Sequence, residues 1–587
     1  MRNEPAVASF ATRLRKGPSV ASRHFEVEPH SDGSKSLVVH SRGMDVLDNP
    51  QLNRGTGFTQ AERDHLGLHG LLPAAVETLD QQVARNYDSF LAAETDIDKW
   101  EFLTGLHDTN EVLFYRLVGE HVTEMLPIVY TPTVGTAIEE FSHLFRRPRG
   151  VFLNVEDIDG IDRALAATGL GPDDVDLVVA SDAEAILGIG DWGVGGVDIS
   201  IGKLAVYTVA GGIDPTRVLA VGLDVGTNRE KLLTDPRYLG LKRSRVRGEE
   251  YDRFIDEYVA RASERFPNAI LHWEDFAAPT ARGILGRYGD KLCTFDDDIQ
   301  GTAAVGLACA LSGVRVSGRR LVDQQIVVFG AGSAGVGIAD LIRLALEDEG
   351  LTHEQSASRI WLIDRPGLLT SDMDLADYQE PYGKDPELAA DWRAADGTLG
   401  LAEVIANLEP TMLVGTSGVT GAFSEEIIRS LHSGCDRPVV LPMSNPTYLA
   451  EQTPANILAW TDGQALVATG SPFGPVDLDG TTYMIGQANN ALLFPGLGLG
   501  TIVCRSSLIT DKMFLAGARA LASLADPSDP AKGLLPSIER LREVSATVAV
   551  EVIKAAVDSG LNRVPVPDPI EAVETAMWNP EYLPINH

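Results

Sequence analysis

A glycine-rich run directly after an apolar strand constrains the fold of this chain more than any other feature. Residues Gln325–Phe329 (QIVVF) predict a buried strand, Gly330–Gly335 (GAGSAG) follow at once, and Val336–Leu346 have the apolar pattern of a helix. Glycines at this spacing let the backbone approach a pyrophosphate, and the helix N-terminus supplies N–H donors and a positive dipole end. The run therefore predicts a Rossmann-type, doubly wound sheet whose dinucleotide is contacted by Gly330, Ala331, Gly332, Ser333, Ala334 and Gly335.

The next predicted strand bears on which dinucleotide is bound. The predicted strand Arg359–Ile363 contains the apolar run Ile360–Ile363 and leads into Asp364, whose carboxylate suits the ribose hydroxyls. A carboxylate at this place repels a 2′-phosphate, which favours NAD over NADP. Arg365 follows it and is able to accept that phosphate, so NADP stays open at this point.

Short runs rich in β-branched residues predict the strands of two α/β units. With 587 residues, the chain is too long for a single core and should form two to four domains. We expect an irregular tail (1–50), a helical N-terminal region (51–125), a first α/β domain (126–298), a dinucleotide-binding domain (299–510) and a helical C-terminal region (511–587). The first unit should hold strands at Pro127–Tyr130, Asp176–Ala180, Val218–Leu223 and Ala269–Trp273 and a helix at Glu249–Arg265; the second should add Thr411–Val414, Val439–Leu441 and Ala465–Ala468 to the two strands above.

Charge and cysteine content exclude several classes of partner and site. The formal net charge of −34 repels nucleic acid and anionic membranes, so we expect neither as a partner. No apolar run reaches the ~18 residues typical of a membrane span. The four cysteines are far apart and form no CxxC pair, which argues against disulfides or zinc and fits a reducing cytoplasm. The arginine-bearing first 25 residues lack a secretory signal's apolar segment, which leaves a disordered tail or a transit peptide.

Two acidic clusters have aromatic or aliphatic neighbours. They are Trp273–Phe276 (WEDF) and Phe295–Thr302 (FDDDIQGT). Acidic clusters are commonly solvated surface, but such neighbours favour burial, and the first cluster ends a predicted strand, where ligands gather in open α/β sheets. Oxygen ligands suit Mg²⁺ or Mn²⁺, and nearby Cys or His pairs that would suit zinc are lacking. A hard metal beside a nicotinamide suits the oxidation of a hydroxy acid followed by its decarboxylation.

Two further side chains are candidates for acid–base chemistry. Lys203 lies in the apolar stretch Ile199–Val206, where burial should lower its pKa toward that of a general base, unless the side chain reaches the surface. Tyr130 ends a predicted strand and is either a proton donor or a half-buried packing residue.

The whole pattern resembles the malic enzymes from about Leu47 through the C-terminal helices. The segments that carry this resemblance are Phe114–Arg116, Pro127–Gly135, Ile186–Gly193, Gly202–Thr208, Asp224–Thr227, Glu274–Phe276, Phe295–Thr302, Ser444–Pro446 and Gln487–Gly496.

The resemblance implies a role for each candidate residue. Lys203 would be the general base that takes the C2 hydroxyl proton of (S)-malate while NAD⁺ accepts the hydride, and Tyr130 would protonate C3 after CO₂ has left. Asp297 would support the base. The metal ligands would be Glu274, Asp275 and Asp298, and substrate and nicotinamide ribose would be contacted by Asn445 and Asn490. Such enzymes are dimers or dimers of dimers.

One departure from the family keeps other activities open. Many malic enzymes carry an arginine where this chain has Ala185, and that arginine would bind the substrate carboxylate bidentately. Malolactic enzymes, a close branch, also have a small residue there; they retain NADH and convert malate to lactate and CO₂. The segments Tyr130–Gly135 and Arg147–Gly150 look like the malic type. A catalytically silent NAD-sensing protein is a third possibility.

Overall fold

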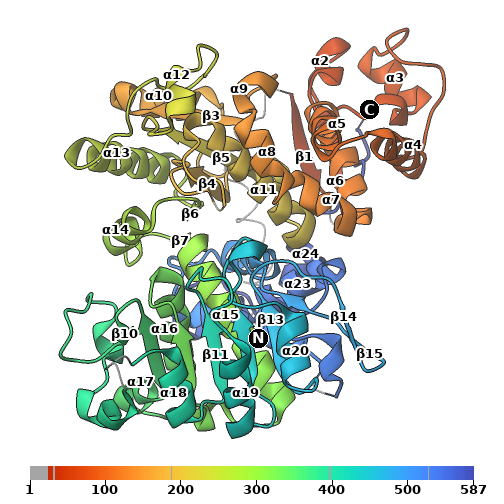
Figure 1. Ribbon diagram of the computed structural model, residues 1–587. Coiled ribbons are helices and arrows are strands. Elements are labelled where there is room, and N and C mark those ends of the chain that lie inside the picture. The colour runs from red at the N-terminus through yellow and green to blue at the C-terminus, as the bar shows by residue number, and fades with distance from the viewer. Residues whose placement is uncertain are drawn as a thin grey trace, which may run out of the picture.

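The computed structural model describes residues 24–30, 34–186, 188–394, 397, 399–526 and 528–586. The arginine-bearing start of the chain and Leu187, within the Ile186–Gly193 segment, lie outside the described residues. Figure 1 shows two sheet-containing halves stacked on each other, with a helical N-terminal region beside the upper one.

The N-terminal region is helical, as predicted, from Thr59 onward. Three helices start with a threonine whose hydroxyl accepts an N–H bond of the first turn: Thr59, Thr78 and Thr95. The stretch predicted to be irregular nevertheless contains a short antiparallel hairpin. Only a few of its side chains are buried, so its sequence lacks the apolar pattern by which a strand is predicted. The elements are β1 (Phe25–Pro29), β2 (Lys35–Val39), α2 (Met44–Leu47), α3 (Gln60–Leu66), α4 (Leu79–Ala92), α5 (Asp96–Thr109), α6 (Glu111–Glu120), α7 (Val122–Val129), α8 (Thr133–Glu139) and α9 (Phe141–Leu144).

The predicted strand at Pro127–Tyr130 is wrong. Helix α7 runs through Val129, with Pro127 inside it, and Tyr130 is the residue that ends it. The run of β-branched residues suggested a strand, but Met125, Leu126, Ile128 and Val129 are all buried, and packing on several sides of a short helix overrides local propensity.

A five-stranded parallel sheet forms the first α/β unit, in the order β3-β5-β4-β6-β7. Its side chains alternate between two cores: Leu177 and Val179 pack with α11, whereas Val178 and Ala180 pack with α13. Apart from 127–130, the predicted strands and the helix Glu249–Arg265 are confirmed. The elements are β3 (Gly150–Asn154), α10 (Ile161–Ala167), β4 (Leu177–Ser181), α11 (Val197–Gly211), β5 (Val218–Asp224), α12 (Glu230–Thr234), α13 (Glu249–Arg265), β6 (Ile270–Trp273), α14 (Ala278–Tyr288), β7 (Thr294–Asp296) and the π-helical turn η5 (Asp297–Gly301).

A seven-stranded sheet forms the second unit, in the order β10-β9-β8-β11-β12-β13-β16. Helices cover both faces: Val328 faces the core that holds α15 and α16, and Val327 faces the core that holds α18, α19 and α20. All five predicted strands and the doubly wound class are confirmed. The elements are α15 (Thr302–Ser317), β8 (Ile326–Phe329), α16 (Ser333–Asp348), α17 (His353–Ser358), β9 (Ile360–Asp364), β10 (Gly367–Leu368), α18 (Leu401–Leu408), β11 (Met412–Gly415), α19 (Glu425–Gly434), β12 (Val439–Pro442), α20 (Pro454–Trp460), β13 (Leu466–Thr469), β14 (Val476–Leu478), β15 (Thr481–Tyr483) and β16 (Gly486–Gln487).

The last helices join the two units through one continuous core. Helices α21 (Phe494–Cys504), α22 (Asp511–Ser523), α23 (Leu541–Asp558) and α24 (Pro569–Ala576) contribute to the same cluster as α11 and α15. By length and hydropathy, Asp297–Ser317 is the one helical segment of the described chain that could cross a bilayer. Since 72% of its apolar window is buried inside the protein, it has the character of a core helix.

The end of the chain completes the N-terminal region. Leu37 N–H donates to Pro584 O (2.8 Å), and Asn586 N–H donates to Leu37 O (2.8 Å), so the C-terminal residues extend the hairpin. Ile585 is buried in a small cluster with Phe25, Leu37 and Phe58. The first and last described residues therefore depend on each other for burial.

This dependence predicts the effect of one truncation in that cluster. Ile585→Ala should lower the local free energy of unfolding by about 2–5 kcal/mol, because it leaves a cavity among buried apolar side chains. Hydrogen exchange of the amides in residues 34–39 would measure the loss of protection. Ile570→Ala, at a side chain that is 58% exposed, is the control and should leave exchange unchanged; equal exchange in both variants would contradict the packing described.

Candidate active site

A buried lysine is the centre of the candidate site. Lys203 lies midway along α11 and is 1% exposed. Its Nζ donates to Glu274 Oε1 and to Asp297 Oδ2, at 2.6 Å each. The two carboxylates follow β6 and β7, which are neighbours in the sheet, and the two-residue period of a strand points both toward α11. The structure thus brings together three residues that are separated by up to 94 positions in the chain.

The electrostatics of Lys203 differ from the prediction. Burial does disfavour the ammonium, but the Asp297 and Glu274 carboxylates outweigh it and raise the pKa of Lys203 well above its ordinary value. The expectation that burial would lower the pKa of Lys203 is therefore wrong for the protein without a bound cation. The two carboxylates are far from Lys203 in the sequence, so their effect could not be predicted from it.

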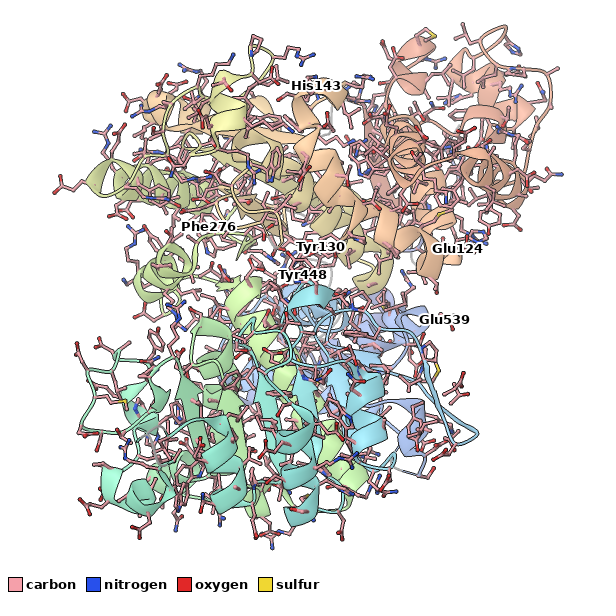
Figure 2. All side chains as sticks on the ribbon, viewed as in Figure 1. Glu124, Tyr130, His143, Phe276, Tyr448 and Glu539 are labelled. Carbon is pink, nitrogen blue, oxygen red and sulfur yellow. The ribbon has the colours of Figure 1, made fainter. Side chains whose placement is uncertain are left out.

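Tyr130 lies on the other side of the lysine. Its Oη accepts a hydrogen bond from Lys203 Nζ at 3.1 Å and is 3.3 Å from Glu274 Oε1. Burial raises the pKa of Tyr130 well above its ordinary value. The charge of Lys203 lowers this pKa, whereas Glu274 and Asp297 raise it further. The phenol therefore stays protonated and lies within reach of a proton on Lys203. Figure 2 shows Tyr130 between the two halves of the molecule.

The carboxyl groups of the acidic clusters are largely buried and raise one another's pKa. Burial, with Asp297 nearby, raises the pKa of Glu274 to about 7, and burial together with Glu274 raises the pKa of Asp298 to about 7. Asp296 Oδ2 and Asp297 Oδ1 are buried and have no hydrogen-bond partner among the described residues. Clustered buried carboxylates of this kind are stabilised by a cation, and an all-oxygen set suits Mg²⁺ or Mn²⁺.

Two of the predicted metal ligands are adjacent through the backbone. Asp275 N–H donates to Asp298 Oδ2 at 2.7 Å, and Asp275 has a positive φ of 60°, a conformation that is costly for a residue with a side chain. Glu274 precedes Asp275, so the three predicted ligands lie together where β6 and β7 end. Their donors fit a divalent cation, and this ligand set stays a prediction.

His272 is a site residue that sequence reasoning missed. Ligand atoms of His272, Glu274 and Asp297 lie within 4.8 Å of one another, a spacing that also suits an ion. However, both ring nitrogens are engaged, Nε2 with Glu274 Oε2 (2.9 Å) and Nδ1 with Tyr207 Oη (2.7 Å). Burial lowers the pKa of His272 to about 3, so the neutral ring orients Glu274 rather than competing for the ion. The sequence contained one signal for this role. His272 lies two residues before Glu274, and side chains at that spacing along a strand point to the same face of the sheet.

A residue of the second unit reaches the carboxylate of Asp297. Asn490, which follows β16, donates from Nδ2 to Asp297 Oδ2 at 3.0 Å and lies 3.1 Å from Thr302 Oγ1. The amide therefore links the edge of the seven-stranded sheet to the lysine site and places Asn490 where the two sheets meet.

The glycine turn has the shape that a dinucleotide requires. Gly330 has a φ of 108°, and a Cβ there would lie 2.6 Å from the Thr416 backbone; a Cβ on Gly335 would lie 2.0 Å from Gly330 O. A Cβ on Gly332, by contrast, meets nothing within 4 Å. The first and third glycines thus close the turn, and the second faces open space. The turn lies where β8 meets β11 and the winding direction of the sheet reverses, the place where such sheets bind ligands.

The other predicted cofactor residues end or follow strands of the same sheet. Asp364 ends β9, next to β8, and accepts a hydrogen bond from the Arg365 N–H (2.8 Å). Asn445 follows β12, and its Oδ1 accepts from Ser471 Oγ at 2.6 Å. Their roles toward cofactor and substrate stay predictions.

The loop that carries Ala185 is held by arginines. Ala185 N–H donates to Asp275 O at 3.0 Å, so the loop touches the carboxylate cluster. Arg245 donates to Asp182 O at 2.9 Å and to Asp191 Oδ1 at 2.7 Å. Arg229 donates to Asp191 O at 2.6 Å. Arg247 forms an ion pair with Glu184. These three guanidinium groups are therefore engaged in hydrogen bonds with residues of the loop that carries Ala185.

Comparison with known sequences agrees with this arrangement. Residues 107–289 match the family model described as the malic enzyme N-terminal domain, and residues 299–557 match that of the malic enzyme NAD binding domain. The chain is 57% identical to the NAD-dependent malic enzyme 3 of Bacillus subtilis over 96% of this chain and 99% of that protein. The chain belongs to the malic enzyme family. It is also 45% identical to the NAD-dependent malic enzyme of Sodalis glossinidius, over 95% of this chain and 99% of the relative.

Solved malic enzyme structures share the fold at lower identity. The malic enzyme of Pyrococcus horikoshii matches with a TM-score of 0.52 and 24% identity, covering 77% of this chain and 88% of that one. That of Entamoeba histolytica matches with a TM-score of 0.51 and 22% identity, covering 88% and 92%. At these identities the likeness concerns the fold of the malic enzymes alone.

The glycine turn predicts that two similar substitutions will act differently. Gly332→Ala should fold normally, because its methyl group meets open space, but should weaken NAD⁺ binding by about tenfold or more by filling the path of the pyrophosphate. Gly330→Ala should instead destabilise the protein, since both its φ and the Thr416 backbone oppose a side chain. Thermal unfolding and calorimetric NAD⁺ titration of both variants measure the contrast; unchanged NAD⁺ affinity in Gly332→Ala would contradict the binding mode.

Proposed function

We propose that this chain oxidises and decarboxylates (S)-malate to pyruvate and CO₂ with reduction of NAD⁺, aided by Mg²⁺ or Mn²⁺. The observation that carries the proposal is the Lys203–Tyr130–Asp297–Glu274 cluster beside a dinucleotide turn. A base, an acid and an oxygen-ligand set for a hard cation lie within hydrogen-bond reach of one another. The names and domains of the family agree with this activity.

In this proposal Lys203 and Tyr130 share the protons of the reaction. Neutral Lys203 takes the C2 hydroxyl proton as the C2 hydride passes to the nicotinamide, and the ketone forms. After the carboxylate on C3 has left as CO₂, the Tyr130 hydroxyl protonates C3. Since Lys203 Nζ lies 3.1 Å from Tyr130 Oη, the lysine is able to return the proton that it took.

The remaining residues position these groups and the cofactor. Asp297 orients Lys203, and Asn490 holds Asp297. Asn445 and Asn490 would contact the substrate and the nicotinamide ribose. Glu274, Asp275 and Asp298 would hold the divalent cation. When bound, it polarises the C2 oxygen as a Lewis acid and neutralises the carboxylates around Lys203. Asp364 at the end of β9 would bind the ribose hydroxyls of NAD.

We further propose a homo-oligomer, dimeric or tetrameric, in the cytoplasm. The assembly follows the resemblance described above. The compartment follows from four cysteines that are buried and form no disulfide with one another.

Product analysis tests the proposed reaction. With (S)-malate, Mn²⁺ and stoichiometric NAD⁺, NADH should appear one-for-one with pyruvate. Lactate and CO₂ without free NADH would make the chain a malolactic enzyme instead, an outcome that Ala185 in place of an arginine would help to explain. Binding of NAD⁺ without turnover of malate would leave only a nucleotide sensor.

Substitution of the two proton-transfer residues tests their separate roles. Lys203→Ala should slow NADH-dependent reduction of oxaloacetate by about 10²–10⁴-fold, because general acid–base help at C2 is lost. NAD⁺ affinity should be retained. Tyr130→Phe is the matched comparison, since it should keep most of this reduction yet slow pyruvate formation from malate. Retained reduction in Lys203→Ala would remove the lysine from the base role.

A further inference from the structure

A guanidinium from the first α/β unit lies against the glycine turn of the second. Arg282 belongs to α14, which follows β6 and the Glu274–Phe276 cluster. Its Nε donates to Ser333 Oγ at 3.0 Å, and its Nη2 lies 3.4 Å from Ser333 O. Ser333 is the first residue of α16. Figure 1 shows α14 above α16, at the level where the two halves meet.

The guanidinium of Arg282 forms no ion pair with a described residue, although the carboxylate of Asp340 on α16 interacts with its charge. In the part of the chain that the structure describes, no carboxylate lies within 4.0 Å of its guanidinium, whereas Arg287 on the same helix pairs with Asp252 and Asp256. Arg282 also lies at the positive end of the α16 dipole. The guanidinium and the positive end of the helix dipole face each other without an ion-paired carboxylate among the described residues, an arrangement that favours the binding of an anion.

The guanidinium is held in place by the segment that follows β10. Its Cζ lies 4.4 Å from the centre of the Tyr378 ring, and Gln379 Nε2 donates to Ala331 O at 2.8 Å. The arginine is thus packed against an aromatic face on one side and the turn on the other. Because Gly332 faces open space beside Ser333, an anion has room to reach both the turn and the guanidinium.

We propose that Arg282 binds the pyrophosphate of NAD, so that the unit carrying the carboxylates clamps a cofactor held by the other unit. A guanidinium donates two parallel bonds to phosphate oxygens, and the α16 N–H groups contact the same anion from the other side. Arg282 is then a cofactor-binding residue from outside the glycine-rich motif. This inference rests on the proposed function, because it requires that the turn binds NAD.

Calorimetric titration without malate tests the assignment. Arg282→Ala should raise the dissociation constants of NAD⁺ and of ADP-ribose by the same factor, about 10- to 100-fold. The dissociation constant of adenosine, which lacks phosphate, should stay unchanged. Arg282→Gln removes the charge but keeps the length and a donor, so it should show a similar loss and serves if the alanine variant does not fold. Arg287→Ala is the control and should bind all three ligands as the unaltered chain does.

Several outcomes would overturn the assignment. Unchanged affinity for ADP-ribose, or an equal loss for adenosine and ADP-ribose, would reduce Arg282 to a contact between the two units. A loss for NADP⁺ but not NAD⁺ would place the guanidinium at the ribose. Failure of the unaltered chain to bind NAD⁺ would overturn the proposed function together with this inference, so the two failures are distinguishable.

Discussion

The ion pairs of Lys203 with Glu274 and Asp297 are the interaction on which the arrangement of the site depends. Three charged groups are taken out of water here, a cost that only close pairing offsets. The pairing fixes α11 against the ends of β6 and β7, and so sets where Tyr130, His272 and the neighbouring aspartates can lie. The same charges that hold the helix in place are those that the proposed chemistry would use.

Contacts across the junction of the two sheets converge on this cluster and on the glycine turn. Asn490 reaches from the seven-stranded sheet to Asp297, and Arg282 reaches from the opposite side to Ser333. The continuous core beneath them includes α11, α15 and the C-terminal helices. Substrate carboxylates and cofactor phosphates would thus meet at a junction whose two sides already touch through polar groups.

Much of the fold was predictable because its signals are local. Buried parallel strands are continuous apolar runs, and the GAGSAG turn carries its own geometry, so the Rossmann unit and its binding edge follow from short segments. The acidic clusters were recognisable from their apolar neighbours. Local signals failed where packing decides: Pro127–Tyr130 is the end of a helix, and the hairpin at Phe25–Val39 buries too few residues to show a pattern.

The electrostatics of the site could not be predicted, because they depend on distant residues. The pKa of Lys203 is set by carboxylates 71 and 94 positions away. In the sequence, Arg282 looks like an ordinary helix residue. Folding places its guanidinium beside Ser333, which is 51 positions further along the chain. His272 was hidden in an apolar strand, where a histidine usually signals only a satisfied core residue. Domain boundaries likewise stay predictions, since one core joins several of the expected parts.

The pairing of Leu37 with Pro584 and Asn586 has a consequence for biosynthesis. A ribosome makes Leu37 long before it makes Pro584 and Asn586. The cluster of Phe25, Leu37 and Phe58 is therefore completed only after Ile585 has been made, and α11 is covered only after α21 and α23 have been made. A nascent polypeptide that lacks α21 and α23 therefore leaves α11, which carries Lys203, incompletely covered.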